Sequence, residues 1–363
     1  MSFIAGIGTA LPKYQLNQMQ IYQYMSALYN LPADHERKHE LLYQRSGISK
    51  RYSCVPDYDT TLNQVELYDK DAKTDPFPSI EKRMDLYFQH ALPLSLNAVD
   101  HLLQKMPAFS IKDITHIITV SCTGMSAPGL DILLLEALNL GSNTERTSVN
   151  FMGCYAAVHG LKQAHAICQN NTKANVLLLS VELCTLHFQK KPDYDNLTAN
   201  ALFGDGAAAV LISGSEPKGR TMEIKDFYSE LQFGGKKDMA WQLSSTGFLM
   251  TLSSYIPQLV EQNILQLIQH ALHKYGLPLS EVSNWAIHPG GRKILEVISA
   301  QLNLSKQDLN ASYEVLKNYG NMSSPTILFV LAELLYNSEN TGPAIGTAFG
   351  PGLTMETFLM DIK

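Results

Sequence analysis

The order of apolar and polar positions predicts an alternation of buried strands and amphipathic helices. Residues 114–121 (ITHIITVS) and 175–183 (NVLLLSVEL) are nearly unbroken apolar runs, the pattern of strands that are covered on both faces. Residues 159–170 and 255–276 have apolar positions at helical spacing, and the second segment ends at Gly276, two residues before a proline. Such an alternation indicates an α/β protein.

Three segments of the first half are echoed in the second half. THIITVSCTG (115–124) resembles SNWAIHPGG (283–291), and VNFMGCYAAVHGLKQA (149–164) resembles YGNMSSPTILFVLAELL (319–335). NVLLLSVEL in turn resembles PAIGTAFGPG (343–352). We therefore expect two similar halves, residues 1–220 and 221–363, which place matching elements around a pseudo-symmetric centre.

Composition and charge narrow the class of protein. A chain of 363 residues has room for two core-bearing units, and a net charge of −6 without a basic stripe argues against nucleic-acid binding. Five cysteines without CxxC pairs indicate reduced thiols in a cytoplasm, with neither a disulfide framework nor a zinc site. The N-terminus reads as a first strand and not as a signal peptide.

Two segments need separate comment. The strongest apolar runs are interrupted by Glu182 and Glu333 and are too short to span a membrane. Residues 53–78 are polar and rich in turn formers, so we expect a surface excursion there.

Cys154 is the first candidate for chemistry. It follows an apolar segment and Gly153, and it precedes a helical run of small residues. The thiolate is the nucleophilic form of cysteine, and a helix N-terminus lowers the pKa of a thiol. The small residues leave room for a bulky acyl group. The alternative is a buried core cysteine.

His288, Asn321 and a glycine-proline loop are candidate partners of this thiol. His288 ends a strand that Pro289 stops, at the strand's carboxyl end, where α/β sheets build their sites. Asn321 precedes an apolar helix, and together these side chains would donate hydrogen bonds to one oxyanion or enolate. The alternatives are a hydrogen-bonded turn histidine and a helix N-cap. Gly350–Pro351–Gly352 makes a rigid loop, for which the alternative is an ordinary tight turn.

Five segments, in chain order, resemble the signature segments of the chalcone synthase-like, type III polyketide synthases: GCYAA, ALFGDGAAAVLISG, WAIHPGG, YGNMSSP and AFGPGLTMET. The resemblance runs from IAGIGTALP to GLTMET and excludes residues 53–78. It implies a thiolase-like fold, with two similar halves in a five-layered αβαβα core, and a homodimer. The ketoacyl-carrier-protein synthases III share the Cys-His-Asn set, but typically carry a different histidine segment and lack the FGPG loop.

The resemblance also implies an activity. Cys154 would accept an acyl group from a starter acyl-CoA, and His288 would stabilise its thiolate as an ion pair. Malonyl-CoA would then lose carbon dioxide, and His288 and Asn321 would hold the resulting enolate until it lengthens the Cys-bound chain by two carbons. No metal or redox cofactor is implied, because coenzyme A is only the carrier of the substrates.

By the same resemblance, several residues would line the substrate cavity. Phe203 matches a phenylalanine that gates the junction between the CoA tunnel and the cavity, and Met250 stands where relatives carry a second gating phenylalanine. Cys122, Cys184 and His187 correspond to small cavity-lining positions of plant members.

Lys38 and Arg45 fall where the family places basic contacts to the CoA phosphates, and Leu41 replaces a basic residue between them. The alternative for both charges is a solvated helix face.

Two other functions fit parts of the pattern. A cysteine hydrolase has the same Cys, His, Asn order, but the C-G-[SA]-C-[WY] context is absent. A non-catalytic partner with the same fold often loses the cysteine, which this chain keeps.

Overall fold

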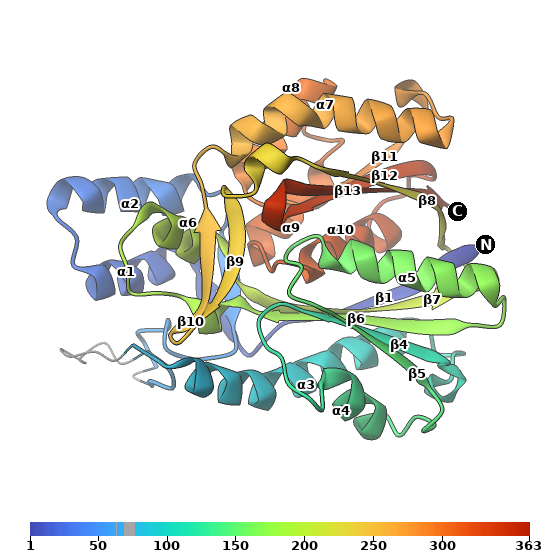
Figure 1. The fold of residues 1–363 in the computed structure, drawn as a ribbon, viewed down its shortest axis with the longest axis horizontal. Coiled ribbons are helices and arrows are strands. Elements are labelled where there is room, and N and C mark those ends of the chain that lie inside the picture. The colour runs from blue at the N-terminus through green and yellow to red at the C-terminus, as the bar shows by residue number, and fades with distance from the viewer. Residues whose placement is uncertain (63, 69–76) are drawn as a thin grey trace.

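The computed structural model describes residues 1–62, 64–68 and 77–363, and its centre is a large mixed sheet (Figure 1). The strands follow the order β11-β12-β13-β8-β1-β7-β6-β4-β5. Their bounds are β1 (Ser2–Ala10), β4 (His116–Ser121), β5 (Glu145–Asn150), β6 (Asn175–Leu183), β7 (Asp205–Ser213), β8 (Met222–Leu231), β11 (Asn284–Ile287), β12 (Gly342–Gly350) and β13 (Thr354–Ile362).

The pairing pattern repeats on the two sides of this sheet. β7 is antiparallel to β1 and to β6, and β6 is parallel to β4. On the other side, β13 is antiparallel to β8 and to β12, and β12 is parallel to β11. The two sides meet where β1 pairs antiparallel with β8. The echo in the sequence is therefore confirmed, because β4 corresponds to β11 and β6 to β12. The boundary at residues 220 and 221 stays a prediction.

Helices complete five layers. α3 (Ile80–Lys105) and α4 (Leu130–Ala137) cover the outer face of the β1–β7 side, whereas α7 (Ile256–Tyr275) and α8 (Arg292–Leu302) cover the β8–β13 side (Figure 1). Between the two sides of the sheet lie α5 (Ala156–Asn170) and α10 (Pro325–Tyr336), which contact each other and strands of both sides. The expected αβαβα arrangement of a thiolase-like fold is confirmed.

The central position of α10 explains its sequence. Its residues from Pro325 to Leu331 are all buried, as expected of a helix that is apolar around its whole circumference. α7 instead has one buried stripe and ends at Gly276 in the left-handed conformation, as the sequence indicated. Within the described ranges, no helix is both long and apolar enough to cross a membrane.

Smaller elements stand at one end of the layers, on the left of Figure 1. They include the antiparallel hairpin of β9 and β10, and the antiparallel pair of β2 and β3, which α1 and α2 connect. α9 follows α8 and contacts β3. The bounds of the elements at this end are α1 (Gln18–Tyr29), α2 (Ala33–Arg45), α6 (Tyr194–Leu202), β2 (Tyr14–Asn17), β3 (Lys50–Ser53), β9 (Met239–Ser244) and β10 (Gly247–Leu252). α9 spans Asn310–Tyr319 and is drawn nearer the middle of the molecule (Figure 1).

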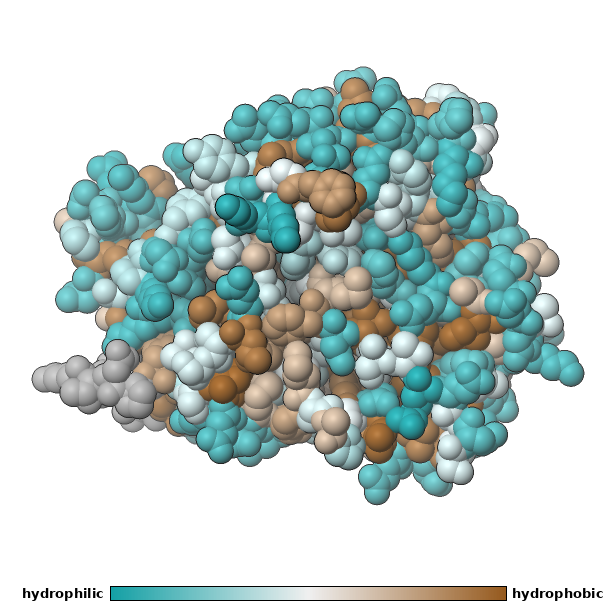
Figure 2. Space-filling view, viewed as in Figure 1, coloured by the Kyte–Doolittle hydropathy of each residue, from teal (hydrophilic) through white to brown (hydrophobic). Residues whose placement is uncertain are grey.

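The surface is mostly hydrophilic, but apolar residues gather in the middle of the face shown in Figure 2, beside β9 and β10. Several large apolar side chains are strongly exposed: Phe233 is 83%, Leu243 and Tyr255 are 64%, and Met125 is 45% exposed. A contiguous apolar area on a surface is typical of an interaction site, whereas single exposed apolar side chains are common.

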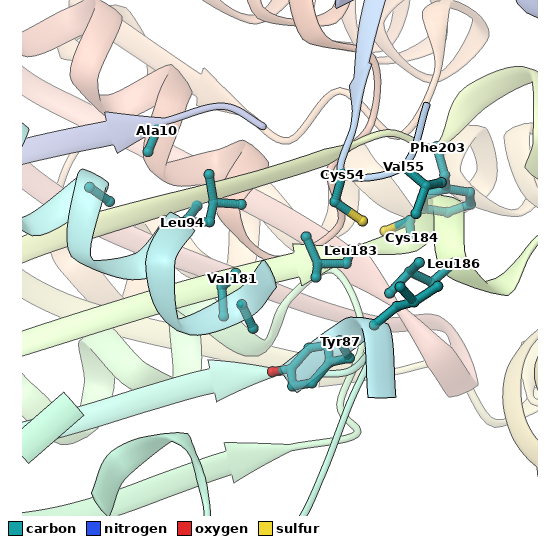
Figure 3. Close-up of a cluster of buried hydrophobic side chains, with 14 of the residues drawn as sticks. Ala10, Cys54, Val55, Tyr87, Leu94, Val181, Leu183, Cys184, Leu186 and Phe203 are labelled. Atoms are coloured by element: carbon teal, nitrogen blue, oxygen red, sulfur yellow. The ribbon is translucent and has the colours of Figure 1, made fainter. Parts of the chain in front are cut away.

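The core of the β1–β7 side reaches the end of the layers where these small elements stand. Figure 3 shows Leu94 of α3 packed over Val181 and Leu183 of β6, with Cys184 and Phe203 at the end of the cluster. This apolar cluster is therefore continuous from the strands of the sheet to Cys184 and Phe203, two of the residues that the sequence predicts around a cavity.

The expected surface excursion at residues 53–78 is wrong for the part that the structure describes. Cys54, Tyr58 and Tyr68 are buried, and the hydroxyls of both tyrosines donate to the carbonyl oxygen of Thr185, at 2.7 and 2.9 Å. Aromatic anchors pull this polar segment inward, because their rings pack in the core while their hydroxyls find backbone acceptors. Residues 63 and 69–76 lie outside the described residues.

Candidate active site

One pocket with a volume of about 430 Å³ gathers most of the predicted site residues from distant parts of the chain. The residues of the predicted set that line it are Lys38, Arg45, Cys122, Cys154, Cys184, His187, Phe203, Met250, His288, Asn321 and Pro351. Leu41 lines it too. Gly350 and Gly352 do not line the pocket, but shape the loop that Pro351 presents to it.

Cys154 lies in the turn between β5 and α5, and that turn is fixed by close backbone packing. Gly153 has φ +80°, and a Cβ there would come within 2.3 Å of Pro351 Cδ. A Cβ on Gly350 would lie 2.5 Å from the ring of Tyr155. Only glycine fits at these two positions. The Gly350–Pro351–Gly352 loop is thus a buttress for the cysteine turn, which is more than an ordinary tight turn.

The environment of the Cys154 thiol differs from the sequence expectation. The side chain is 9% exposed, and burial raises its pKa to about 11. A hydrogen bond with the Ser323 side chain opposes this shift, the nearby carboxyl of Glu182 adds to it, and a hydrogen bond with the Asn321 side chain opposes it. The expected lowering of the pKa by the helix N-terminus is therefore wrong for this thiol, because desolvation outweighs it.

His288 follows β11, and its N–H donates to the carbonyl oxygen of Thr347 at 2.9 Å. The imidazole is buried, and neither ring nitrogen has a hydrogen-bond partner among the described residues. The alternative of a hydrogen-bonded turn histidine is therefore wrong. Burial lowers the pKa of His288 to about 3, so the imidazole is neutral as long as no negative charge lies beside it. Two unoccupied nitrogens in a pocket are available to a bound molecule.

Asn321 does not cap a helix. α10 begins at Pro325 with Ser324 at the N-cap, whereas the Asn321 Oδ1 accepts the Ser323 N–H at 2.8 Å. Its Nδ2 donates to Gly290 O at 3.3 Å. This pair of bonds fixes which end of the amide is the donor, so the NH₂ group is directed to the same side as the thiol.

His187 forms a wall of the pocket together with two aromatic residues that the sequence reasoning missed. Its Nε2 donates to Thr123 O at 2.7 Å and its Nδ1 accepts the Phe248 N–H at 3.1 Å. The ring stacks on Phe248 with centroids 4.4 Å apart, and Trp241 packs edge-on against both. Both nitrogens are therefore engaged, and His187 serves as a cavity wall. The sequence signal for this wall was the alternation of apolar and polar residues along β9 and β10, which includes one of the two tryptophans of the chain.

Glu182 is a second missed residue, because it entered the sequence reasoning only as a break in an apolar run. It is fully buried, and its carboxylate accepts from the Cys122 N–H at 2.9 Å, Thr123 Oγ1 at 2.8 Å and Ser324 Oγ at 2.6 Å. Burial raises its pKa to about 7. The carboxylate ties the end of β4 to the start of α10 behind the thiol.

Basic side chains line the pocket from two walls. Lys38 and Arg45 come from α2, and Arg292 and Lys293 from the start of α8. Arg292 packs over Gly47, where a Cβ would lie 3.1 Å from the Cβ of Arg292. A solvated helix face would not explain why basic side chains of α2 and α8 line the same pocket. The sequence reasoning missed the basic residues of α8 because it examined only α2.

Comparisons with known proteins identify the family of this chain. The model of the chalcone and stilbene synthase N-terminal domain matches residues 1–217, and that of the C-terminal domain matches residues 226–362. Type III polyketide synthase A of Arabidopsis thaliana is 34% identical over 90% of this chain and 83% of its own. The α-pyrone synthesis polyketide synthase-like Pks18 of Mycobacterium tuberculosis is 28% identical over 100% of this chain and 91% of its own. The crystal structure of PKS-I from the brown alga Ectocarpus siliculosus has a TM-score of 0.89 and 30% identity, covering 99% and 98% of the two chains.

The chain belongs to the chalcone and stilbene synthase family, the type III polyketide synthases. This family of condensing enzymes differs from both alternatives, the cysteine hydrolases and the ketoacyl-carrier-protein synthases III. The family models therefore favour neither of them.

Proposed function

We propose that this protein condenses malonyl-CoA with an acyl-CoA starter through an acyl thioester on Cys154. The observation that carries the proposal is the meeting of Cys154, His288 and Asn321, from three separate segments, in one pocket of the family fold. A thiol, an unoccupied imidazole and an oriented amide donor are the groups that decarboxylative condensation uses.

The first half of the reaction moves a proton and an acyl group. Burial disfavours a charge on Cys154 alone and on His288 alone. A proton that passes from the thiol to the imidazole creates both charges together, so that each stabilises the other. The thiolate attacks the thioester carbonyl of the starter, the bond to the CoA sulfur breaks, and the CoA thiolate takes the proton from His288.

The second half forms a carbon–carbon bond. Malonyl-CoA loses carbon dioxide, and the electron pair of the broken bond becomes the enolate of acetyl-CoA, whose oxygen accepts hydrogen bonds from His288 and from the Asn321 NH₂ group. The enolate carbon attacks the acyl carbonyl on Cys154, and the cysteine leaves as a thiolate. The product is a 3-ketoacyl-CoA that is two carbons longer than the starter, and the steps need no metal or redox cofactor.

Substrate entry and assembly are part of the proposal. Lys38, Arg45, Arg292 and Lys293 supply positive charge for the phosphates of the CoA thioesters, and Phe203 and Met250 control passage to the cavity. We also propose a homodimer in the cytoplasm, since the exposed apolar side chains on the face shown in Figure 2 offer a surface for a second copy.

The assay that tests the function is incubation with radiolabelled malonyl-CoA and a panel of short, long, branched and aromatic acyl-CoAs. We expect labelled products whose masses exceed the starter by the two-carbon units added, with release of carbon dioxide. Absence of any elongated product across the panel, with a folded protein, would overturn the proposal.

Replacing Met250 by Phe should narrow the range of starters. Met250 lines the pocket, pairs with Trp241 across the β9–β10 hairpin, and has a flexible thioether that adapts to varied acyl shapes. We expect specificity constants for long and branched starters to fall relative to short ones, while malonyl-CoA decarboxylation stays close to wild type. Unchanged ratios among short, long and aromatic starters would show that Met250 is only a packing residue.

A further inference from the structure

Arg51, on β3, is a buried cation whose role is not explained by the reaction above. It is 1% exposed, and within the described ranges no carboxylate forms an ion pair with it. Its Nε donates to Gln18 Oε1 at 2.8 Å and its Nη1 donates to the carbonyl oxygen of Phe203. A buried guanidinium that has no ion pair lowers the stability of the fold, which indicates that Arg51 has another role.

The acceptor of this bond lies beside Asn321. Phe203 and Asn321 form an isolated parallel β-bridge, in which the Gly204 N–H donates to Asn321 O at 2.9 Å and the Asn321 N–H donates to Leu202 O at 3.0 Å. This pairing leaves the carbonyl of Phe203 pointing away from Asn321. Arg51 binds that carbonyl, and thereby holds the bridge from its outer side.

The stem of Arg51 touches the residues next to both partners of the bridge. A Cβ on Gly204 would lie 3.3 Å from Arg51 Cβ, and a Cβ on Gly320 would lie 2.7 Å from Arg51 Cδ. Gly204 follows Phe203, and Gly320 precedes Asn321. One side chain therefore packs against both short segments that meet at the bridge, although more than 100 residues separate them in the sequence.

Gln18 fixes the direction of the guanidinium. While its Oε1 accepts from Arg51, its Nε2 donates to Ala201 O at 2.8 Å and to Ser46 Oγ at 3.2 Å. The ring of Tyr43 lies 5.9 Å from Arg51 Cζ. The fork of the arginine is thus held in one orientation before any substrate binds.

We propose that Arg51 is a positioning residue for condensation, which holds the gating side chain of Phe203 and the enolate-binding amide of Asn321 in fixed relation to each other. The proposal rests on the proposed function, because it assigns Arg51 to the step in which Asn321 acts. It leaves the acyl transfer to Cys154 largely independent of Arg51, since that step uses the thiol and His288.

The test is the Arg51→Lys variant, which keeps the charge but has one ammonium in place of the planar fork. We expect the kcat of condensation to fall about tenfold to a hundredfold, as for a small displacement of a catalytic group. The rate of acyl loading on Cys154, followed by intact mass after a pulse of starter acyl-CoA, should change far less.

Arg83→Lys is the matched control. Arg83 is also fully buried and donates to backbone carbonyls, those of Leu186 and Phe188, but it does not touch the bridge. We expect this variant to lose stability without a selective loss of condensation. Should Arg51→Lys fail to fold, Gln18→Leu keeps the Arg51 bond to the carbonyl oxygen of Phe203 but removes the Nε contact, together with the Gln18 bonds to Ala201 O and Ser46 Oγ. It should show the same selective loss on a smaller scale.

Three outcomes decide between the hypotheses. A selective loss of condensation in the Arg51→Lys or Gln18→Leu variant, absent in Arg83→Lys, supports the positioning role. Equal losses of loading and condensation would overturn it and leave Arg51 as a purely structural residue. A folded wild-type protein that loads a starter but never condenses it would overturn the proposed function itself.

Discussion

Replacing Cys154 by Ala is expected to reduce elongation by about a thousandfold or more, because both the loading of the starter and the formation of the carbon–carbon bond take place on its sulfur. The fold should survive, since the thiol occupies a pocket wall and its main-chain turn is held by Gly153 and Pro351. Elongation by product mass and loading by intact protein mass measure the effect, and a thermal transition close to wild type is the control. Elongation at the wild-type rate in this variant would contradict the proposed mechanism.

Alkylation of the same thiol tests its partnership with His288. Cys154 lines the pocket, whereas Cys54 and Cys168 do not, so iodoacetamide should modify Cys154 ahead of these two. With His288 present, proton transfer to the imidazole should make the alkylation rate nearly constant between about pH 6 and 8.

The His288→Gln variant should change that pH profile. In the variant the buried thiol has no imidazole to accept its proton, so burial keeps its pKa above the ordinary value and it is mostly protonated and unreactive at neutral pH. Its alkylation rate should therefore be low at pH 7 and rise by up to about tenfold for each pH unit above it. A wild-type rate that rises in the same way would show that His288 does not share the proton.

Much of the fold was predictable from the sequence, because its periodicities reflect burial. β6 has the predicted bounds of 175–183, and α7 ends at the predicted glycine, since both elements carry an unambiguous pattern. The echo between NVLLLSVEL and PAIGTAFGPG identified two strands that occupy matching places in the sheet order. Residues 53–62 escaped this reasoning, because their polar composition concealed the tyrosines that anchor them.

The site was predictable as a set of residue types, but not as an electrostatic environment. Local sequence shows that Cys154 precedes a helix, yet the pKa of its thiol depends on burial by segments far away in the chain. Glu182, Arg292 and Arg51 were missed for the same reason, because their relevance depends on distant partners. The roles of Cys154, His288 and Asn321 stay predictions.

Replacing Asn321 by Ala should separate the two halves of the reaction. The Asn321 NH₂ group is oriented by the Ser323 N–H and is positioned to donate to an enolate oxygen, while acyl transfer relies on the thiol and His288. We expect condensation and malonyl-CoA decarboxylation to fall about a hundredfold to a thousandfold, the range for loss of one preorganised donor. Loading of the starter on Cys154 should fall much less, even though Asn321 also donates to the thiol.

The measurements are single-turnover loading, carbon dioxide release and product formation on the same preparation. Asn321→Asp is the informative companion, since it keeps the size and an acceptor for the Ser323 N–H but replaces the NH₂ donor by a second oxygen. It should be as poor as Asn321→Ala in condensation, because a carboxylate repels the enolate. A loss of loading as large as the loss of condensation in Asn321→Ala, or an unimpaired rate of condensation in either variant, would contradict the assignment of Asn321 to the enolate step.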